Sequence, residues 1–339
     1  MKFLSRDAPY WRGADSVRTM MMSVSLALLP VMLVSAWVLG VGIVVNAVLA
    51  CLFCVALEAL ALRLRGRPAL ASALDGSALI TGLLIALAIP PLTPWWVTAV
   101  ACLFAIVFAK HVYGGLGYNV FNPAMVGYVV VLVSFPQHIA LWPAPDSAPG
   151  LVEALQFIGG GAFDSATVDA LTAATPLDSI KIQLGQMRTM REIFADPTGT
   201  QLAYRDWTWI NVAALAGGLW LLRKKVIRWH IPAAMLTTMG LLYLIAYAAD
   251  SAVHMAPTVG LFSGGTMLGA FFVATDPVSA ATTERGRLLY GAGIGMLCFV
   301  IREWGAYPDG LAFAVLLMNM AVPLLDRYTQ PRIYGHGRG

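Results

Sequence analysis

The sequence predicts an all-α polytopic membrane protein with about ten transmembrane helices in two inverted five-helix repeats, some of them short or broken. Three observations support this fold class. Only 12% of the 339 residues are charged and 59% are hydrophobic, whereas soluble domains carry about 25% charged residues. About ten apolar segments approach the roughly 20 residues that a spanning helix needs. A long polar loop at 137–206 separates a first membrane half at 1–136 from a second at 207–339.

The apolar segments follow one another with short connections everywhere except at this loop. They are expected at 20–39, 41–61, 77–90, 95–109, 123–136, 207–222, 231–249, 257–274, 288–301 and 309–325. Basic residues precede the first segment, as they would before a signal peptide: Lys2, Arg6, Arg12 and Arg18. The apolar run is too long for a signal-peptide core and no cleavage site follows, so a retained first helix is predicted.

The distribution of basic residues predicts the orientation, because cytoplasmic loops of membrane proteins carry an excess of Lys and Arg. With the N-terminus in the cytoplasm, 17 of the 22 basic residues fall on the cytoplasmic side. The remaining ones are Lys181, Arg188, Arg191, Arg205 and Arg302. Both termini are therefore expected in the cytoplasm, and the 137–206 loop is expected outside.

An internal repeat is suggested by the third and eighth segments, which are short and bounded by glycine and proline. An odd number of helices in each half makes any repeat inverted. A shift of 187 positions aligns Gly82 with Gly269 and Pro90 with Pro277. Interrupted segments at corresponding positions point to a central site in membrane proteins with repeats. The alternative is that glycine and proline are simply frequent in membrane helices.

Polar residues within the membrane segments have several possible roles. Asn122 is predicted to cap the fifth helix, with Pro123 in its first turn. Two interpretations of Asp276 stay open: an acid on an ion path, or a cap for the next helix at the cytoplasmic interface. Glu58 is expected to pair with an arginine or to reach the membrane edge.

Candidate redox and metal residues form no recognisable site. Cys51 and Cys54 share one helix face, but two thiolates are too few for an iron–sulfur cluster, and packing is the expected role. The five histidines lack metal-ligand spacing, and no dinucleotide fingerprint is present. No metal site, catalytic residue or nucleic-acid partner is therefore predicted.

The external loop carries eight acidic and four basic residues. The glycine run at 159–161 and several prolines argue against a compact folded domain. Thr175 lies in the middle of the loop after two alanines, and Pro176 disfavours a helical conformation for it. A threonine hydroxyl is a poor nucleophile without a base, and the sequence shows no base beside it. The residues alone leave two interpretations of Thr175 open: part of an ordinary Ala-Thr-Pro loop sequence, or an attachment point that another enzyme modifies.

The motif Asp169-x-x-Thr172-x-Ala174-Thr175, followed by Pro-Leu-Asp, resembles the flavinylation motif of the D subunit of Rnf electron-transport complexes. The B subunit of the sodium-pumping NADH:quinone reductase has a related motif. Here Thr172-Ala173 replaces the usual Ser-Gly, which leaves the acceptor threonine in place. The resemblance extends over nearly the whole chain. Further matching stretches are 113–117, 121–125, 228–232, 267–272, 275–278, 307–310 and 334–336.

The resemblance implies that Thr175 carries FMN through a phosphodiester bond made by a flavin transferase. It implies a second, non-covalent flavin (riboflavin or FMN), for which no residues are assigned. The expected partners are the lipid bilayer and the other membrane, flavin and iron–sulfur subunits of an Rnf complex in the bacterial inner membrane. That complex would pass electrons between NADH and ferredoxin or flavodoxin and couple them to Na⁺ or H⁺ movement. The chain would not be catalytic alone. The alternative function is a stand-alone secondary transporter or channel with inverted-repeat architecture.

Overall fold

The computed structural model of the chain describes residues 17–67, 75–144, 149–161, 168, 170–195 and 199–330. Helices dominate these residues, whose one sheet has two short strands. The chain is an all-helical polytopic membrane protein, which confirms the predicted fold class. Four of the described helices are long and apolar enough to cross a membrane: α1 (Val17–Leu39), α2 (Gly42–Leu64), α13 (His230–Ala249) and α17 (Leu311–Thr329).

The other membrane segments are shorter, broken or more polar. In the first half they are α4 (Ser77–Ala88), α5 (Trp95–Leu103) with its π-helical continuation η1 (Phe104–His111), and α6 (Pro123–Ser134). In the second half they are α12 (Thr200–Arg223), α14 (Pro257–Phe262), α15 (Thr266–Leu268), the π-helix η2 (Gly269–Val273) and α16 (Glu284–Trp304). The prediction of short and broken helices is confirmed, since α4 has 12 residues and the eighth segment forms three pieces. The sixth helix begins at Thr200 rather than at 207.

Glycine, proline and asparagine set the ends of the interrupted helices. Gly76 precedes α4 with φ +91, and Gly264 separates α14 from α15 with φ +57. Both values lie in the left-handed region that glycine adopts without a steric penalty. The predicted cap of α6 is confirmed, because the Asn122 side chain accepts a hydrogen bond from the Met125 N–H and Pro123 is the first helical residue.

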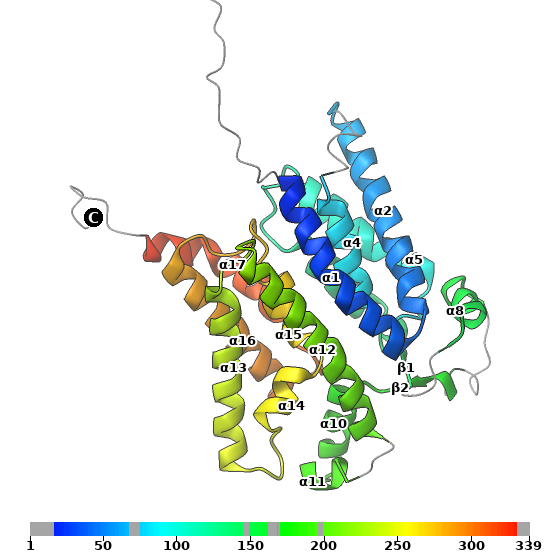
Figure 1. The fold of residues 1–339 in the computed structure, drawn as a ribbon, viewed down its shortest axis with the longest axis vertical. Helices are drawn as coiled ribbons and strands as arrows, with labels where there is room; N and C mark the ends of the chain where they lie inside the picture. The colour runs from blue at the N-terminus through cyan, green and yellow to red at the C-terminus, as the bar shows by residue number, and fades with distance from the viewer. Residues whose placement is uncertain are drawn as a thin grey trace, which may run out of the picture.

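The two halves pack against each other through corresponding segments. The first predicted segment, α1, runs beside the sixth, α12 (Figure 1). The fifth, α6, packs against the tenth, α17. Within the halves, α2 packs against α4 and α5, and α13 packs against α14 and α16. Contacts of first with sixth and of fifth with tenth are what two repeats facing each other across an axis would produce.

The segment between the two membrane halves has more structure than its glycines and prolines suggest. It contains α7 (Pro136–Ile139), β1 (Trp142–Pro143), α8 (Leu151–Ile158), β2 (Thr172–Ala173), α10 (Pro176–Gly185) and α11 (Met190–Ile193). These short elements agree with the prediction that the segment is not a compact folded domain of its own. Leu177 and Ile180 are buried in the same hydrophobic core as the membrane helices. The segment therefore folds on the membrane halves instead of forming a core of its own.

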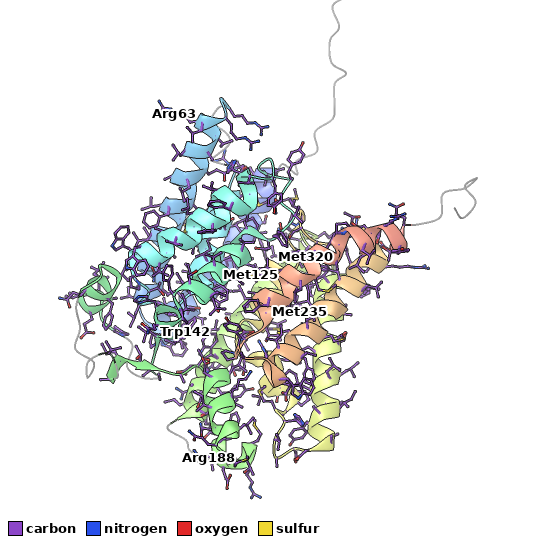
Figure 2. The ribbon with its side chains drawn as sticks, turned by 180° about the vertical axis from the view of Figure 1, so that it is seen from behind. Arg63, Met125, Trp142, Arg188, Met235 and Met320 are labelled. Carbon is purple, nitrogen blue, oxygen red and sulfur yellow. The ribbon has the colours of Figure 1, made fainter. Side chains whose placement is uncertain are left out.

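The end of α2 and the short helices α10 and α11 lie at opposite ends of the molecule. Arg63, near the end of α2, and Arg188, between α10 and α11, lie at opposite ends (Figure 2). The short helices α10 and α11 thus occupy the end of the molecule that is far from Arg63.

Candidate functional site

Thr175 is the N-cap residue of α10. Its backbone is extended, with φ −62 and ψ 161, and Pro176 is the first helical residue. This confirms the extended conformation predicted from the Thr-Pro pair. The Thr175 Oγ1 accepts a hydrogen bond from the Asp178 N–H at 3.2 Å, and its hydroxyl donates to Asp178 Oδ2 at 2.7 Å.

Two attachments hold this cap beside both membrane halves. Strand β2 pairs antiparallel with β1, which places Ala173 opposite Trp142, in the stretch of chain that directly follows the first half. On the other side, the Lys181 ammonium donates to the carbonyl oxygens of Arg302, Gly305 and Tyr307 at 3.2, 2.5 and 3.1 Å. Helix α10 is therefore connected to the first half through the strand ladder and to the second half through Lys181.

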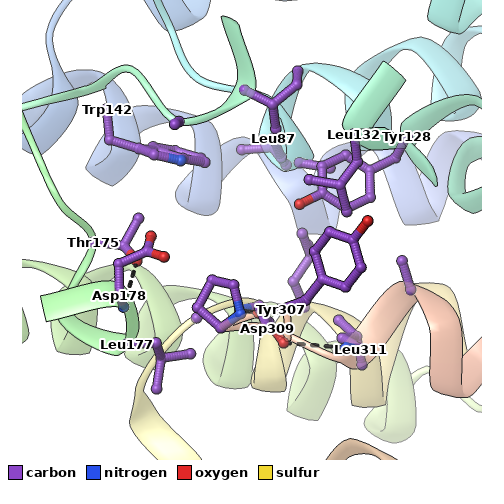
Figure 3. A pocket seen from close by; sticks show the side chains of 18 of the residues that line it. Leu87, Tyr128, Leu132, Trp142, Thr175, Leu177, Asp178, Tyr307, Asp309 and Leu311 are labelled. Carbon is purple, nitrogen blue, oxygen red and sulfur yellow. Dashed lines mark hydrogen bonds between the residues drawn. The ribbon is translucent and has the colours of Figure 1, made fainter. Parts of the chain in front are cut away.

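Thr175 and Asp178 line a cavity of about 270 Å³ at the seam between the halves. Figure 3 shows Trp142 close to Thr175 and Asp178, with Tyr128 and Tyr307 on another side of the space. The first half contributes Leu87, Tyr128 and Leu132, and the second half contributes Gly264, Leu268 and Leu311. The walls are mainly aromatic and aliphatic, and Thr175 and Asp178 supply polar groups on one side.

An ion pair with a buried guanidinium supports the wall of this cavity in the second half. Arg302, whose side chain is fully buried, bonds Asp309 at 2.9 Å. The Arg302 guanidinium also donates to the Gly260 carbonyl at 2.8 Å, and Asp309 accepts from the Gly265 N–H at 2.8 Å. The pair thus satisfies backbone groups that the break between α14 and α15 leaves without helical partners.

The two ionisable groups of α10 are both shifted by burial. Burial raises the pKa of the Asp178 carboxyl above its ordinary value, although the hydrogen bonds with Thr175 oppose the shift. Burial likewise lowers the pKa of the Lys181 ammonium. Each charged form is disfavoured by the loss of water. Asp178 is therefore a stronger base than an exposed aspartate.

The structure places the other predicted residues elsewhere. Asp276 lines a second cavity of about 140 Å³, with Lys110, Asn119 and Phe272. Its Oδ2 accepts from the Ser279 hydroxyl at 2.7 Å and from the Asn119 amide at 3.4 Å. The suggestion that Asp276 caps the next helix was wrong, because Thr283 caps α16. The suggestion of an ion path stays a prediction.

Glu58 is buried and does not pair with an arginine, so that expectation was wrong. It bonds Lys110 at 2.9 Å and lies 3.1 Å from His111, and Lys110 also donates to Ser77 at 2.7 Å. The π-helical turn η1 carries both Lys110 and His111. A partner more than 50 positions away cannot be identified from the spacing of charges on one helix.

The cysteines lie where the packing role predicted for Cys51 and Cys54 would place them. Cys54 and Cys102 are fully buried, and Cys51 is half-buried. Among the described residues, no group of histidine, cysteine or acidic side chains could hold a metal ion. Asp169 of the Thr175 motif lies outside the described residues.

One contact of Thr175 was not predicted from the sequence. No base was evident beside Thr175, yet Asp178 accepts a hydrogen bond from its hydroxyl. A signal existed, because a threonine followed three residues later by an acid is a capping pattern at a helix start. The pattern predicts contact between the two side chains, although it says nothing of the cavity that buries them.

Comparison with known proteins gives consistent matches. The model of the family described as "NQR2, RnfD, RnfE family" matches residues 4–335. The D subunit of an ion-translocating oxidoreductase complex from Aliivibrio salmonicida is 46% identical over 354 residues, covering all of both chains. D subunits of the same description from Vibrio cholerae and Escherichia fergusonii are 46% and 44% identical, over 99% and 100% of this chain and 100% of each of theirs.

Proposed function

The chain belongs to the NQR2, RnfD, RnfE family, and on this premise we propose that it is a membrane subunit of an ion-translocating electron-transport complex that carries FMN covalently on Thr175. The full-length similarity to proteins named as the D subunit of an ion-translocating oxidoreductase complex supports the first part. The position of the Thr175 hydroxyl on the cavity between the membrane halves is the observation that carries the second part.

The residues around Thr175 fit a flavin phosphate. The hydroxyl stands at the N-terminus of a ten-residue helix, where the partial positive charge of the helix favours an anion. Ala174, next to it, is exposed and small, which leaves the approach to the hydroxyl open. Thr172, the other hydroxyl of the motif, is engaged with the Val168 carbonyl at 2.8 Å.

The cavity fits a flat aromatic ring. Trp142 and Tyr128 offer aromatic surface, and Trp142 is itself held edge-on against Trp207 at 5.0 Å between ring centroids. Leucine side chains from both halves exclude water from the remaining walls. A bound FMN would supply one- and two-electron transfer. The chain's own residues would orient the ring and keep its surroundings poor in water.

We further propose that the complex passes electrons between NADH and ferredoxin or flavodoxin and couples them to Na⁺ or H⁺ movement. The chain has no dinucleotide fingerprint, so another subunit would bind NADH. A second, non-covalent flavin would occupy the cavity around Lys110 and Asp276, which lies between α4, η1 and η2. Two of the three N–H groups of the Lys110 ammonium bond Glu58 and Ser77, and the third is a donor suited to the oxygen and nitrogen atoms of a flavin.

We also propose that the complex lies in the bacterial inner membrane with α10 and Thr175 on the external side. The charge asymmetry of the sequence supports this orientation. The separation of Arg63 from Arg188 at opposite ends of the molecule agrees with it (Figure 2). The flavin transferase and the electron-donating subunit would then approach the same external end.

The decisive test is covalent labelling. A phosphodiester bond survives boiling in detergent, so a denaturing gel under ultraviolet light should show a fluorescent band at the 36.3 kDa of this chain. Thr175→Ala should abolish the band completely because no hydroxyl remains to carry phosphate. Thr172→Ala is the matched control and should keep it. Fluorescence that persists in the Thr175→Ala protein would overturn the proposal.

A further inference from the structure

Asp178 is the acidic group closest to the Thr175 hydroxyl among the contacts of this cavity. We propose that Asp178 is the general base that activates Thr175 when FMN is attached, a role that rests on the covalent flavin proposed above. The modification would then be partly catalysed by its own acceptor. The flavin transferase would present the flavin donor, and this chain would supply the group that takes the proton.

The geometry already has the hydroxyl oriented for this transfer. The Thr175 hydroxyl donates to Asp178 Oδ2 at 2.7 Å, a distance within the range required of a general base. The Asp178 N–H donates to Thr175 Oγ1 at 3.2 Å, which fixes the oxygen from the other side. Both contacts come from one helical turn, so the acceptor and its base keep their relative positions without help from another subunit.

The step balances without an oxidant or reductant. Thr175 Oγ1 attacks the riboflavin-side phosphorus of a flavin adenine dinucleotide and forms an oxygen–phosphorus bond. The bond between that phosphorus and the bridging oxygen of the pyrophosphate breaks, and its electron pair leaves with AMP. The proton of the Thr175 hydroxyl moves to Asp178 Oδ2. The products are the phosphodiester on Thr175, AMP and a protonated Asp178.

The environment of Asp178 suits both stages of this step. Burial raises the pKa of the carboxyl, which strengthens it as a base. Once the phosphodiester is in place, an anion stands next to Asp178, and two like charges at that distance disfavour ionisation. Asp178 would therefore stay protonated and donate a hydrogen bond to a phosphate oxygen. This avoids repulsion between two negative charges in a poorly hydrated cavity.

Other titratable groups also face Asp178 and contribute to its proton affinity. Asp309, from the connection before α17, raises the pKa of Asp178, and Lys181 on its own helix lowers it. Tyr128 and Tyr307 line the same cavity from α6 and from the chain after α16. The pH dependence of the attachment rate reflects all of these groups together. The Asp178 variants show whether Asp178 is the group whose protonation lowers the rate at acidic pH.

The test follows labelling kinetics on the full-length chain in membranes, with flavin adenine dinucleotide and an excess of purified flavin transferase. Asp178→Asn keeps a hydrogen-bond acceptor for Thr175 but cannot take a proton, and it should slow attachment by about 100-fold or more. Asp178→Glu should recover part of the rate. Glu192→Gln, at the matching position of the α11 cap, should label like the unchanged chain.

A merely structural role predicts a different pattern. If Asp178 only caps α10, Asp178→Asn would label at the unchanged rate while Asp178→Ala would not, and that result would overturn the proposal. The rate of the unchanged chain should fall as the pH drops through the pKa of Asp178, and the residual rate of Asp178→Asn should lack this fall. An identical pH profile in both would also overturn it. Failure of the unchanged chain to label would instead refute the covalent flavin itself.

Discussion

The segment between the two membrane halves begins two helices with the same capping pattern in very different surroundings. Thr175 and Asp178 cap α10, and Thr189 and Glu192 cap α11 only 14 positions later, each through a hydroxyl that bonds the acid three residues on. Burial raises the pKa of Asp178, whereas hydrogen bonds from Thr189 lower the pKa of the exposed Glu192. The local pattern therefore determines the cap, and the surrounding cavity determines whether the cap can perform proton chemistry.

The largest expected effect comes from removing the support that surrounds the α10 cap. Arg302→Met leaves the partly exposed Asp309 carboxylate and the Gly260 carbonyl without their buried partner, and should lower the free energy of unfolding by about 2–3 kcal/mol. Thermal unfolding in detergent measures the loss. The matched control is Arg205→Met, because the Arg205–Asp206 pair has an exposed guanidinium and should contribute about 1 kcal/mol or less. Equal losses in the two variants would show that the Arg302–Asp309 pair does not support the seam.

A smaller effect is expected from exposing the α10 cap to water, as the α11 cap already is. Trp142→Ala should admit water to the cavity and lower the pKa of Asp178 toward its ordinary value, because burial is the main cause of the shift. Asp178 would then stay ionised to lower pH, so the acidic fall of labelling should move to lower pH. Trp209→Ala, on the exposed side of α12, is the control. An unmoved profile in the Trp142→Ala chain would mean that this wall does not determine the proton affinity of Asp178.

The smallest expected effects are changes in unfolding temperature, which should have opposite signs when Asp178 and Glu192 are neutralised. A raised folded-state pKa means that ionised Asp178 destabilises the fold above that pKa, so Asp178→Asn should raise the unfolding temperature slightly at neutral pH. The lowered pKa of Glu192 has the opposite consequence: its stabilisation is present above the ordinary pKa and lost as the pH falls through the folded-state pKa. Glu192→Gln should therefore lower the unfolding temperature slightly at neutral pH, and this loss should shrink as the pH is lowered. Changes of the same sign in both variants would contradict the comparison.

Features that depend on neighbours in sequence could be predicted, and features that depend on distant segments could not. The extended backbone at Thr175 and the Asn122 cap follow from residues one to three positions away. The fold class follows from composition and the apolar segments. By contrast, the burial of Asp178 depends on side chains from both membrane halves, and the Glu58–Lys110 bond joins residues 52 positions apart. No single-helix pattern contains that information, which explains why Glu58 was assigned the wrong partner.

The double attachment of α10 has a mechanical consequence. Strand β2 connects the start of α10 to the first half, and Lys181 fastens its middle to the end of α16 in the second. Any displacement of one half relative to the other would put mechanical strain on the short stretch of chain between β2 and Lys181. Thr175 lies within that stretch, two residues after the strand and one before the helix. A group bonded to Thr175 would therefore be pulled or turned by the relative movement of the halves, and force applied to that group would in turn reach both of them.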